Sequence, residues 1–180
     1  MTRDESGALT ARLRIEPLSA RHAALLFDAL ADAAIYTYIP DERHASVPSL
    51  ARRYTCLESG APEGALEVWL NWALQRVDTG AYIGTLQATV MLDSRAFIGY
   101  VLTPTVWGQG FATEACRWLV SELQNRFAVD EILATVDTRN VRSQRLLEHL
   151  GFDRIGTAPA EIRGELTSDF RYRLRHGGGA

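Results

Sequence analysis

The stretch VLTPTVWGQGFATEACRWL, residues 101–119, joins a strand-like segment to a helical one through a glycine-containing turn. In the helical part, apolar side chains recur at helical spacing and form one stripe: Ala112, Cys116, Leu119, Val120, Leu123 and Phe127. EILATVDT, residues 131–138, then has the pattern of a short buried strand. A strand, a helix and a second strand in this order form a βαβ unit, which predicts that the two strands are parallel.

Three strand-like segments precede the glycine turn. Residues 66–78, 81–92 and 95–104 are rich in β-branched and aromatic side chains, and the turn signals DTG and DS separate them. This pattern predicts three antiparallel strands in a meander.

The remaining elements lie at the two ends of the chain. We expect a strand near 9–17, a helix over 20–32 with Ser19 as its N-cap, a loop over 33–45, a helix over 46–60, a helix over 141–150, and strands near 152–160 and 168–175. The fold class is therefore α/β of the α+β type. It has a single mixed, mostly antiparallel sheet of six to seven strands with helices on both faces.

Length and composition set further bounds. The 180 residues predict one domain over 1–180, with disordered tails near 1–8 and 176–180. The net charge of −3 argues against a nucleic-acid partner, and no apolar run is long enough to enter a membrane. The charged N-terminus does not have the apolar centre of a signal peptide, which predicts a cytoplasmic protein. Cys56 and Cys116 have no metal-type spacing, so we interpret both as small buried apolar residues and expect no metal.

The glycines of the turn have two interpretations. They permit a tight strand-to-helix connection, or they let an anion approach the unpaired N–H groups at a helix start. A phosphate loop of the Walker type requires a lysine, and the chain contains no lysine. A dinucleotide fingerprint requires a small residue where Thr113 stands.

Two linked motifs carry a family resemblance. VLTPTVWGQGFATEACRWL, followed by VDTRNVRSQRLLEHLGF at residues 136–152, resembles the GNAT superfamily of acyl-CoA-dependent N-acetyltransferases. More narrowly, the chain is similar to the ribosomal-protein N-terminal acetyltransferases of the Rim type. The family's loop reads Q/R-x-x-G-x-G/A and matches residues 107–112, with Trp107 at its first position, and the Asn-x-x-Ser at 140–143 extends the match.

The resemblance implies acetyl-CoA as co-substrate. Its pyrophosphate would lie on the backbone of Trp107, Gly108, Gln109, Gly110, Phe111, Ala112 and Thr113. Its pantetheine arm would follow Val101, Leu102 and Thr103, in a gap between that strand and its parallel neighbour. A backbone N–H near Leu102 would hold the thioester oxygen during transfer.

The second motif supplies several polar candidates. Ser143 is either a hydroxyl bonded to its own backbone or, as the resemblance implies, the group that stabilises the departing thiolate. Asn140 is expected to cap the helix, and the resemblance adds a contact with the pantetheine arm. Arg139, Arg142 and Arg145 form a solvated face or reach the nucleotide phosphates. For Glu114, in the first motif, we expect a structural hydrogen bond near the helix start.

The sequence does not identify the general base that would take the proton of the amine. Phe97 stands where relatives often carry Glu, which leaves Glu67, a water chain or a backbone carbonyl as candidates. Several side chains either position the substrate or pack as ordinary strand and core residues: Asn71, Gln87, Tyr100, Tyr36, Tyr38, Trp69 and Trp72.

We therefore expect an N-acetyltransferase that moves an acetyl group from acetyl-CoA to a primary amine, on a peptide or protein N-terminus or on a small molecule, by direct attack. Two alternatives stay open: a non-catalytic acyl-CoA-binding or sensor module, and a nucleotide-binding α/β module. A homodimer is compatible with the resemblance.

Overall fold

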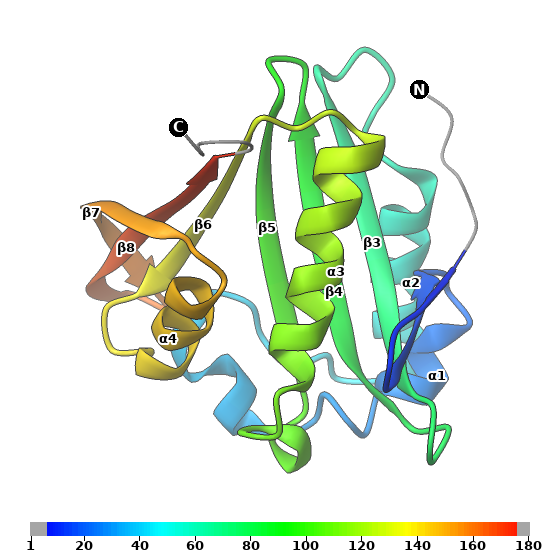
Figure 1. Cartoon of the computed structure of the whole chain (residues 1–180). Helices are drawn as coiled ribbons and strands as arrows, with labels where there is room; N and C mark the ends of the chain where they lie inside the picture. Colours follow the sequence, from blue (N-terminus) through cyan, green and yellow to red (C-terminus); the bar gives the residue numbers. More distant parts are fainter. Residues whose placement is uncertain (1–6, 176–180) are drawn as a thin grey trace.

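The structure, a computed structural model, describes residues 7–175, so most of both expected tails lies outside the described residues. One sheet contains eight strands in the order β1-β2-β3-β4-β5-β6-β8-β7 (Figure 1). The strands are β1 Ala8–Leu9, β2 Leu13–Pro17, β3 Glu67–Arg76, β4 Tyr82–Met91, β5 Arg95–Leu102, β6 Glu131–Asp137, β7 Asp153–Ile162 and β8 Glu165–Arg175.

The mixed, mostly antiparallel α/β fold is confirmed, but the strand count of six to seven is wrong. The expected strand over 9–17 breaks into β1 and β2, because the Thr10 hydroxyl and amide bond to Leu13 across a turn. Ala8, expected in the disordered tail, pairs with Ile15 in β1.

The helices are α1 His22–Leu26, η1 Ala33–Tyr38, α2 Val47–Ser59, η2 Pro104–Val106, α3 Phe111–Arg126 and α4 Val141–His149. The bounds of α2 agree with the prediction, with Ser46 as N-cap and Gly60 as C-cap. The first helix is much shorter than expected, and Ser19 does not cap it: the N-cap position is Arg21, and the Ser19 hydroxyl lies 3.2 Å from Nδ1 of His22. Part of the expected loop is the 3-10 helix η1, which the Asp32 side chain caps.

The two faces of the sheet bury different helices. In Figure 1, α3 crosses one face of β3–β5, while α1 and α2 cover the other. Alternation along the strands follows this division: Ile98, Tyr100 and Leu102 of β5 pack in the α3 core, whereas Val101 packs against the core of α1 and α2.

The two cysteines differ in their surroundings. Cys116 is buried in α3, and burial raises the pKa of its thiol. Cys56 is exposed on α2, so its expected burial is wrong. The buried residues of α2 are Leu50 and Tyr54, and Cys56 lies outside that face.

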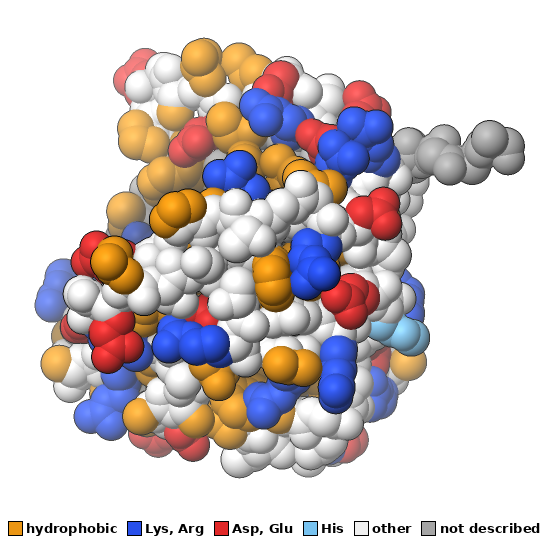
Figure 2. All heavy atoms as spheres, turned by 90° about the vertical axis from the view of Figure 1, so that its left-hand side faces the viewer, with side chains coloured by type: hydrophobic (Ala, Val, Ile, Leu, Met, Phe, Trp, Pro, Cys, Tyr) orange, Lys and Arg blue, Asp and Glu red, His pale blue; other side chains and the backbone are white. Residues whose placement is uncertain are grey.

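The parallel pairing of β5 with β6 is confirmed, and it is short. Only Arg95–Phe97 of β5 pairs with Glu131–Leu133 of β6. Beyond Phe97 the two strands diverge, and the gap opens toward the start of α3 (Figure 1). On the side of the molecule that carries β7 and β8, basic, acidic and apolar side chains are interspersed (Figure 2).

Candidate active site

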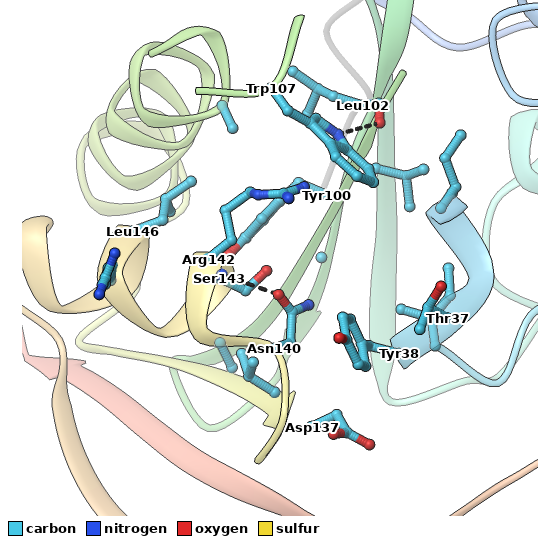
Figure 3. Close-up of a pocket in the computed structure, with 18 of the residues that line it drawn as sticks. Thr37, Tyr38, Tyr100, Leu102, Trp107, Asp137, Asn140, Arg142, Ser143 and Leu146 are labelled. Atoms are coloured by element: carbon cyan, nitrogen blue, oxygen red, sulfur yellow. Dashed lines mark hydrogen bonds between the residues drawn. The ribbon is translucent and has the colours of Figure 1, made fainter. Parts of the chain in front are cut away.

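A cleft of about 1040 Å³ occupies the divergence of β5 and β6. Its walls come from the segment after α1, from β4, β5 and β6, from the start of α3, from α4 and from β8. Figure 3 shows Trp107 and Leu102 at one end, Ser143 of α4 and its N-cap Asn140 on one side, and Thr37 and Tyr38 on the other. Segments distant in the sequence thus form a single concave site.

The turn before α3 presents a row of free amides to this cleft. Gly108 and Gly110 have φ of 75° and 81°, a conformation that favours glycine. Five backbone N–H groups have no hydrogen-bond acceptor among the described residues, namely those of Gly108, Gly110, Phe111, Ala112 and Thr113. No side chain caps α3 at Gly110. The helix start therefore offers unpaired donors and the positive end of a helix dipole to an anion.

Two amides of the same turn are occupied within the chain. The Trp107 amide donates to the Pro104 carbonyl at 3.1 Å and the Gln109 amide to the Val106 carbonyl at 3.4 Å. These bonds close the two turns that precede α3.

The edge of β5 provides a second set of free backbone groups. The Thr103 amide bonds to the Ile83 carbonyl of β4 at 2.8 Å, so its neighbour Leu102 directs its own N–H and C=O to the opposite side, toward the gap. The Leu102 carbonyl accepts from Trp107 Nε1 at 2.8 Å (Figure 3). The Leu102 N–H faces the cleft, and alternation gives the Tyr100 N–H the same direction.

Three of the residues expected to bind cofactor do not line the cleft: Thr103, Gln109 and Phe111. Thr103 is buried against β4, and the Gln109 side chain donates to the Thr105 carbonyl at 2.9 Å. The Phe111 ring is buried, with the Arg12 guanidinium 4.3 Å from its centroid. The Phe111 amide has no acceptor among the described residues, whereas the amide and the carbonyl of Gln109 are both bonded within the chain. The other expected residues all line it: Val101, Leu102, Trp107, Gly108, Gly110, Ala112, Thr113, Asn140, Ser143 and Arg145.

The start of α4 places Ser143 and Asn140 in the cleft. The Asn140 side chain accepts from the Ser143 amide at 3.2 Å, which confirms Asn140 as N-cap (Figure 3). Tyr100 points to the same region, and burial raises the pKa of its hydroxyl, with Ser143 as its polar neighbour. The Tyr100 hydroxyl is buried without a hydrogen-bond partner among the described residues, so the site contains an unsatisfied polar atom.

The three arginines have three different surroundings. Arg139 binds both carboxylate oxygens of Asp137, at 2.9 and 2.8 Å. Arg142 stacks on Trp107, with its guanidinium 3.9 Å from a ring centroid. Arg145 lines the cleft without an ion pair among the described residues. Arg142 and Arg145 are therefore available to an anion, whereas Arg139 is neutralised.

Asp137 is a buried polar residue that sequence reasoning missed. The Arg139 side chain lowers the pKa of Asp137 to about 2, and bonds from the Arg139 amide and the Thr167 hydroxyl add to this effect. The sequence did not single out Asp137, because an Asp at the end of a buried strand is as typical of a turn as of a functional site.

A second missed residue supports the loop from outside the cleft. Arg12 donates to Glu114 Oε2 at 2.7 Å and, through Nη1, to the Gln109 carbonyl at 2.9 Å. Partial burial raises the pKa of Glu114, but hydrogen bonds from Thr10 and Arg12 outweigh it and leave that pKa below its ordinary value. Glu114 thus makes the structural hydrogen bonds expected of it, and no local pattern identified its partner 102 residues away.

The residues that the sequence offered as a general base, or as groups that position the substrate, lie in different parts of the structure. Phe97 is 43% exposed, on the face opposite α3. Glu67 lies at the far end of β3, outside the cleft, and accepts from Trp69 Nε1 at 2.7 Å. Gln87 lines the cleft, whereas Asn71 does not.

The four aromatic residues expected either in the core or at the acceptor site also differ in position. Tyr38 lines the cleft, while Tyr36 donates to the Leu30 carbonyl at 2.8 Å and packs beside the second core. Trp72 is buried against Trp118, with centroids 5.3 Å apart, and Trp69 lies outside the cleft. Tyr38 is thus the one member of this cluster that walls the site.

Two kinds of feature, a membrane-spanning helix and a metal-binding cluster, are not found in the described part of the chain. Within residues 7–175, no helix is both long and apolar enough to cross a membrane. In that same range, His, Cys, Asp and Glu do not gather in a group of three or more that could hold a metal ion.

Residues 12–153 match the family described as Acetyltransferase (GNAT) domain, which covers well over half of the chain. The chain belongs to the GNAT acetyltransferase family. An N-acetyltransferase of Bacillus subtilis (strain 168), YoaA, is 37% identical over 89 residues, which are 48% of this chain and 50% of that protein. The chain thus spans about half the length of this curated relative.

Solved structures share the GNAT fold over nearly the whole chain. The ribosomal-protein-S5-alanine acetyltransferase of Vibrio fischeri has a TM-score of 0.81 at 16% identity, covering 96% of this chain and 98% of that one. Mycobacterium smegmatis RimJ, in complex with CoA-disulfide, has a TM-score of 0.81 at 21% identity, covering 91% and 82%. At these identities the likeness shows the fold.

Proposed function

We propose that this GNAT protein transfers an acetyl group from acetyl-CoA to a primary amine, by direct attack and within the Rim-type branch. One observation carries the proposal: five free amides lie in the turn before α3 and in the first turn of α3, and four of these residues line the cleft between β5 and β6. Trp107 at the start of the loop, and the fold shared with two Rim-type enzymes, support the choice of branch.

The cleft fits the shape and charge of acetyl-CoA. The five free amides would bind the pyrophosphate, and Arg142 and Arg145 would add positive charge beside it. The pantetheine arm would pair with the free edge of β5, as an added strand would. These groups are left unpaired within the chain, and a ligand of this kind would satisfy them.

The transfer itself needs few groups. The amine nitrogen attacks the thioester carbonyl carbon, and the N–H of Leu102 faces the gap to stabilise the oxyanion that forms. The C–S bond then breaks, and Ser143, beside the Tyr100 hydroxyl, stabilises the departing thiolate. We infer no covalent enzyme intermediate, since Cys116 is buried and Cys56 lies outside the cleft.

An acceptor screen tests the activity. The protein is incubated with acetyl-CoA and a panel of peptides with free N-termini, amino acids and small amines, while free thiol is measured. Release that depends on one acceptor class supports the proposal. CoA binding without acceptor-dependent release would favour a non-catalytic acyl-CoA-binding module, and binding of ATP or NAD in place of CoA would favour a nucleotide-binding module.

A substitution in the loop tests where the phosphates bind. Gly110→Glu places bulk and negative charge at the free amides, and we expect it to weaken CoA binding by about 100-fold, or roughly 3 kcal/mol. Calorimetric titration with CoA measures the affinity. The matched control is Gly64→Glu, because Gly64 has a φ of 82°, similar to the 81° of Gly110, but lies away from the cleft. Equal affinities for the two variants would refute the placement.

A further inference from the structure

The proposed function leaves one requirement open, which is a group that takes the proton of the acceptor amine. Phe97 cannot do so, and Glu67 lies outside the cleft. Within the part of the chain that the structure describes, three carboxylates line the cleft: Asp41, Asp137 and Asp169. Their surroundings distinguish them.

Asp169 of β8 and Asp137 of β6 are directly opposite in the antiparallel register, so their side chains share one face of the sheet. This face is the one opposite α3 and α4. Val136 and Phe170, the neighbours of the two aspartates, both pack in the α3 core, and successive side chains alternate. In Figure 3, Asp137 lies below Tyr38 and Asn140, at the end of the cleft away from Trp107 and Leu102.

Asp137 is unavailable as a base. It is 2% exposed, both of its oxygens bind Arg139, and Thr167 donates to Oδ2 at 2.9 Å. Protonation of this carboxylate would break these bonds.

Asp169 has none of these partners. It is half-buried, it lines the cleft, and its carboxylate makes no hydrogen bond or ion pair to any described side chain. Burial, and then the negative charge of Asp137, raise the pKa of Asp169 above its ordinary value. A carboxylate in this state gains by binding a cation and by accepting a proton.

We propose that Asp169 is the catalytic base of this enzyme: its carboxylate binds the ammonium form of the acceptor and removes a proton from it. The inference rests on the proposed function and names a residue for it. It also narrows the acceptor to amines that arrive protonated, such as peptide N-termini and aliphatic amines.

The proton balance is simple. The ammonium loses two protons in becoming an amide. One passes to a carboxylate oxygen of Asp169 before or during the attack and leaves to solvent. The other is lost as the C–N bond forms and the C–S bond breaks, and it ends on the CoA sulfur with the help of Ser143. The products are the amide, free CoA and one released proton.

The other titratable groups of the cleft are placed less well for this role. His149 lies on α4, which packs on the α3 side of the sheet, opposite to the face of Asp169. Asp41 is exposed in the segment after η1. Besides Asp137 and Arg139, the titratable groups on the Asp169 face are Glu165 and Arg171 of β8, and Tyr38 and Asp41 line the same cleft. Of these, Asp137 is the neighbour whose charge raises the pKa of Asp169.

The test compares wild type with Asp169→Asn, using one amine across the pH range from 6 to about 9. Wild type can use the ammonium form, whereas the variant must wait for amine that is already neutral in solution. We expect kcat/KM of Asp169→Asn to be about 100-fold lower at pH 7 and to recover about tenfold per pH unit toward the pKa of the amine. A structural defect would lower the rate equally at every pH.

Two further readouts separate catalysis from folding. CoA affinity should stay within about twofold, since the phosphate and pantetheine contacts lie elsewhere. Tm at pH 7 should not fall: the folded-state pKa of Asp169 is raised, so its ionised form opposes folding at neutral pH, and Asn removes that charge. Asp153→Asn, at the other end of the β7–β8 hairpin, is the matched control and should behave as wild type.

The possible results are distinct. An active wild type with an unimpaired Asp169→Asn, or with a loss that does not vary with pH, overturns this inference. The same pH-dependent loss in Asp41→Asn or His149→Asn, and not in Asp169→Asn, overturns it as well. A wild type that binds CoA but releases no thiol with any amine overturns the proposed function instead.

Discussion

At the scale of single residues, the arrangement around Asp137 shows how one ion pair shapes the site. Arg139 and Asp137 are two positions apart, and their pairing removes Arg139 from the cations that face the cleft. The same pairing keeps Asp137 ionised and fixes the chain where β6 ends and α4 is about to begin. Arg142 and Arg145 remain as the cations that we propose bind the phosphates, and Asp169 as the carboxylate that we propose binds the acceptor.

The Asp137 network predicts a pH-dependent contribution to stability. Its folded-state pKa of about 2 lies below the ordinary 3.8, so the stabilisation is present above that ordinary value and is lost as the pH falls through 2. We expect Asp137→Asn to lower the free energy of unfolding by about 1–2 kcal/mol at pH 7. The difference from wild type should shrink as the pH falls toward 2 and approach zero below it. Denaturant unfolding at several pH values measures it, and a difference that does not change with pH would exclude the ion pair as its cause.

The sequence predicted the role of a residue well where that role depends only on its neighbours in the chain. The cap by Asn140 follows from the side chain and its own helix start. The structural bonds of Glu114 were expected at the start of α3, but the partner Arg12 lies on a distant segment. Cys56 shows the opposite case: an apolar residue type predicted burial, but its place on α2 leaves it exposed.

At the scale of elements, the end of β5 is held by a close approach to β4. A Cβ at Gly84 would lie 2.1 Å from the Val101 carbonyl oxygen and 2.8 Å from Leu102 Cα. Only glycine lets β4 pass this point, and the contact sets the position of the Leu102 N–H that faces the gap.

Gly84→Ala should therefore displace β5 at the site. We expect a loss of about 1–3 kcal/mol in the free energy of unfolding, as for other overpacked positions. We also expect kcat to fall by more than the loss of folded protein explains, because the oxyanion donor moves. Gly156→Ala in β7 is the control, since nothing lies within 4 Å of a Cβ there. If the folded fraction of Gly84→Ala turns over at the wild-type rate, Leu102 does not act as we propose.

The elements with strong periodicity were predicted closely. The meander, the parallel pair of β5 and β6, and α2 with its caps all follow from apolar patterns and turn residues. The helices that were predicted wrongly are short. α1 ends at Leu26 although apolar residues continue, and η1 has too few residues for a periodic signal.

At the scale of the whole molecule, the topology brings the site together. The motif residues of α3 and α4 could be recognised in the sequence because each set is contiguous. Tyr38 was named only as one of four aromatic candidates, and Asp169 was not named, since it lines the cleft only once β8 inserts between β6 and β7. The cofactor half was therefore predictable, whereas the acceptor half required the fold.

The central claim is that the turn before α3 binds the phosphates of acetyl-CoA through its backbone. The most direct measurement is a titration of isotopically labelled protein with CoA, followed by NMR at each backbone amide. The account predicts large shifts and new exchange protection at Gly108, Gly110, Phe111, Ala112 and Thr113, with smaller changes at Trp107 and Gln109, whose amides are already bonded. Saturable CoA binding that leaves those five amides unshifted and unprotected would contradict it.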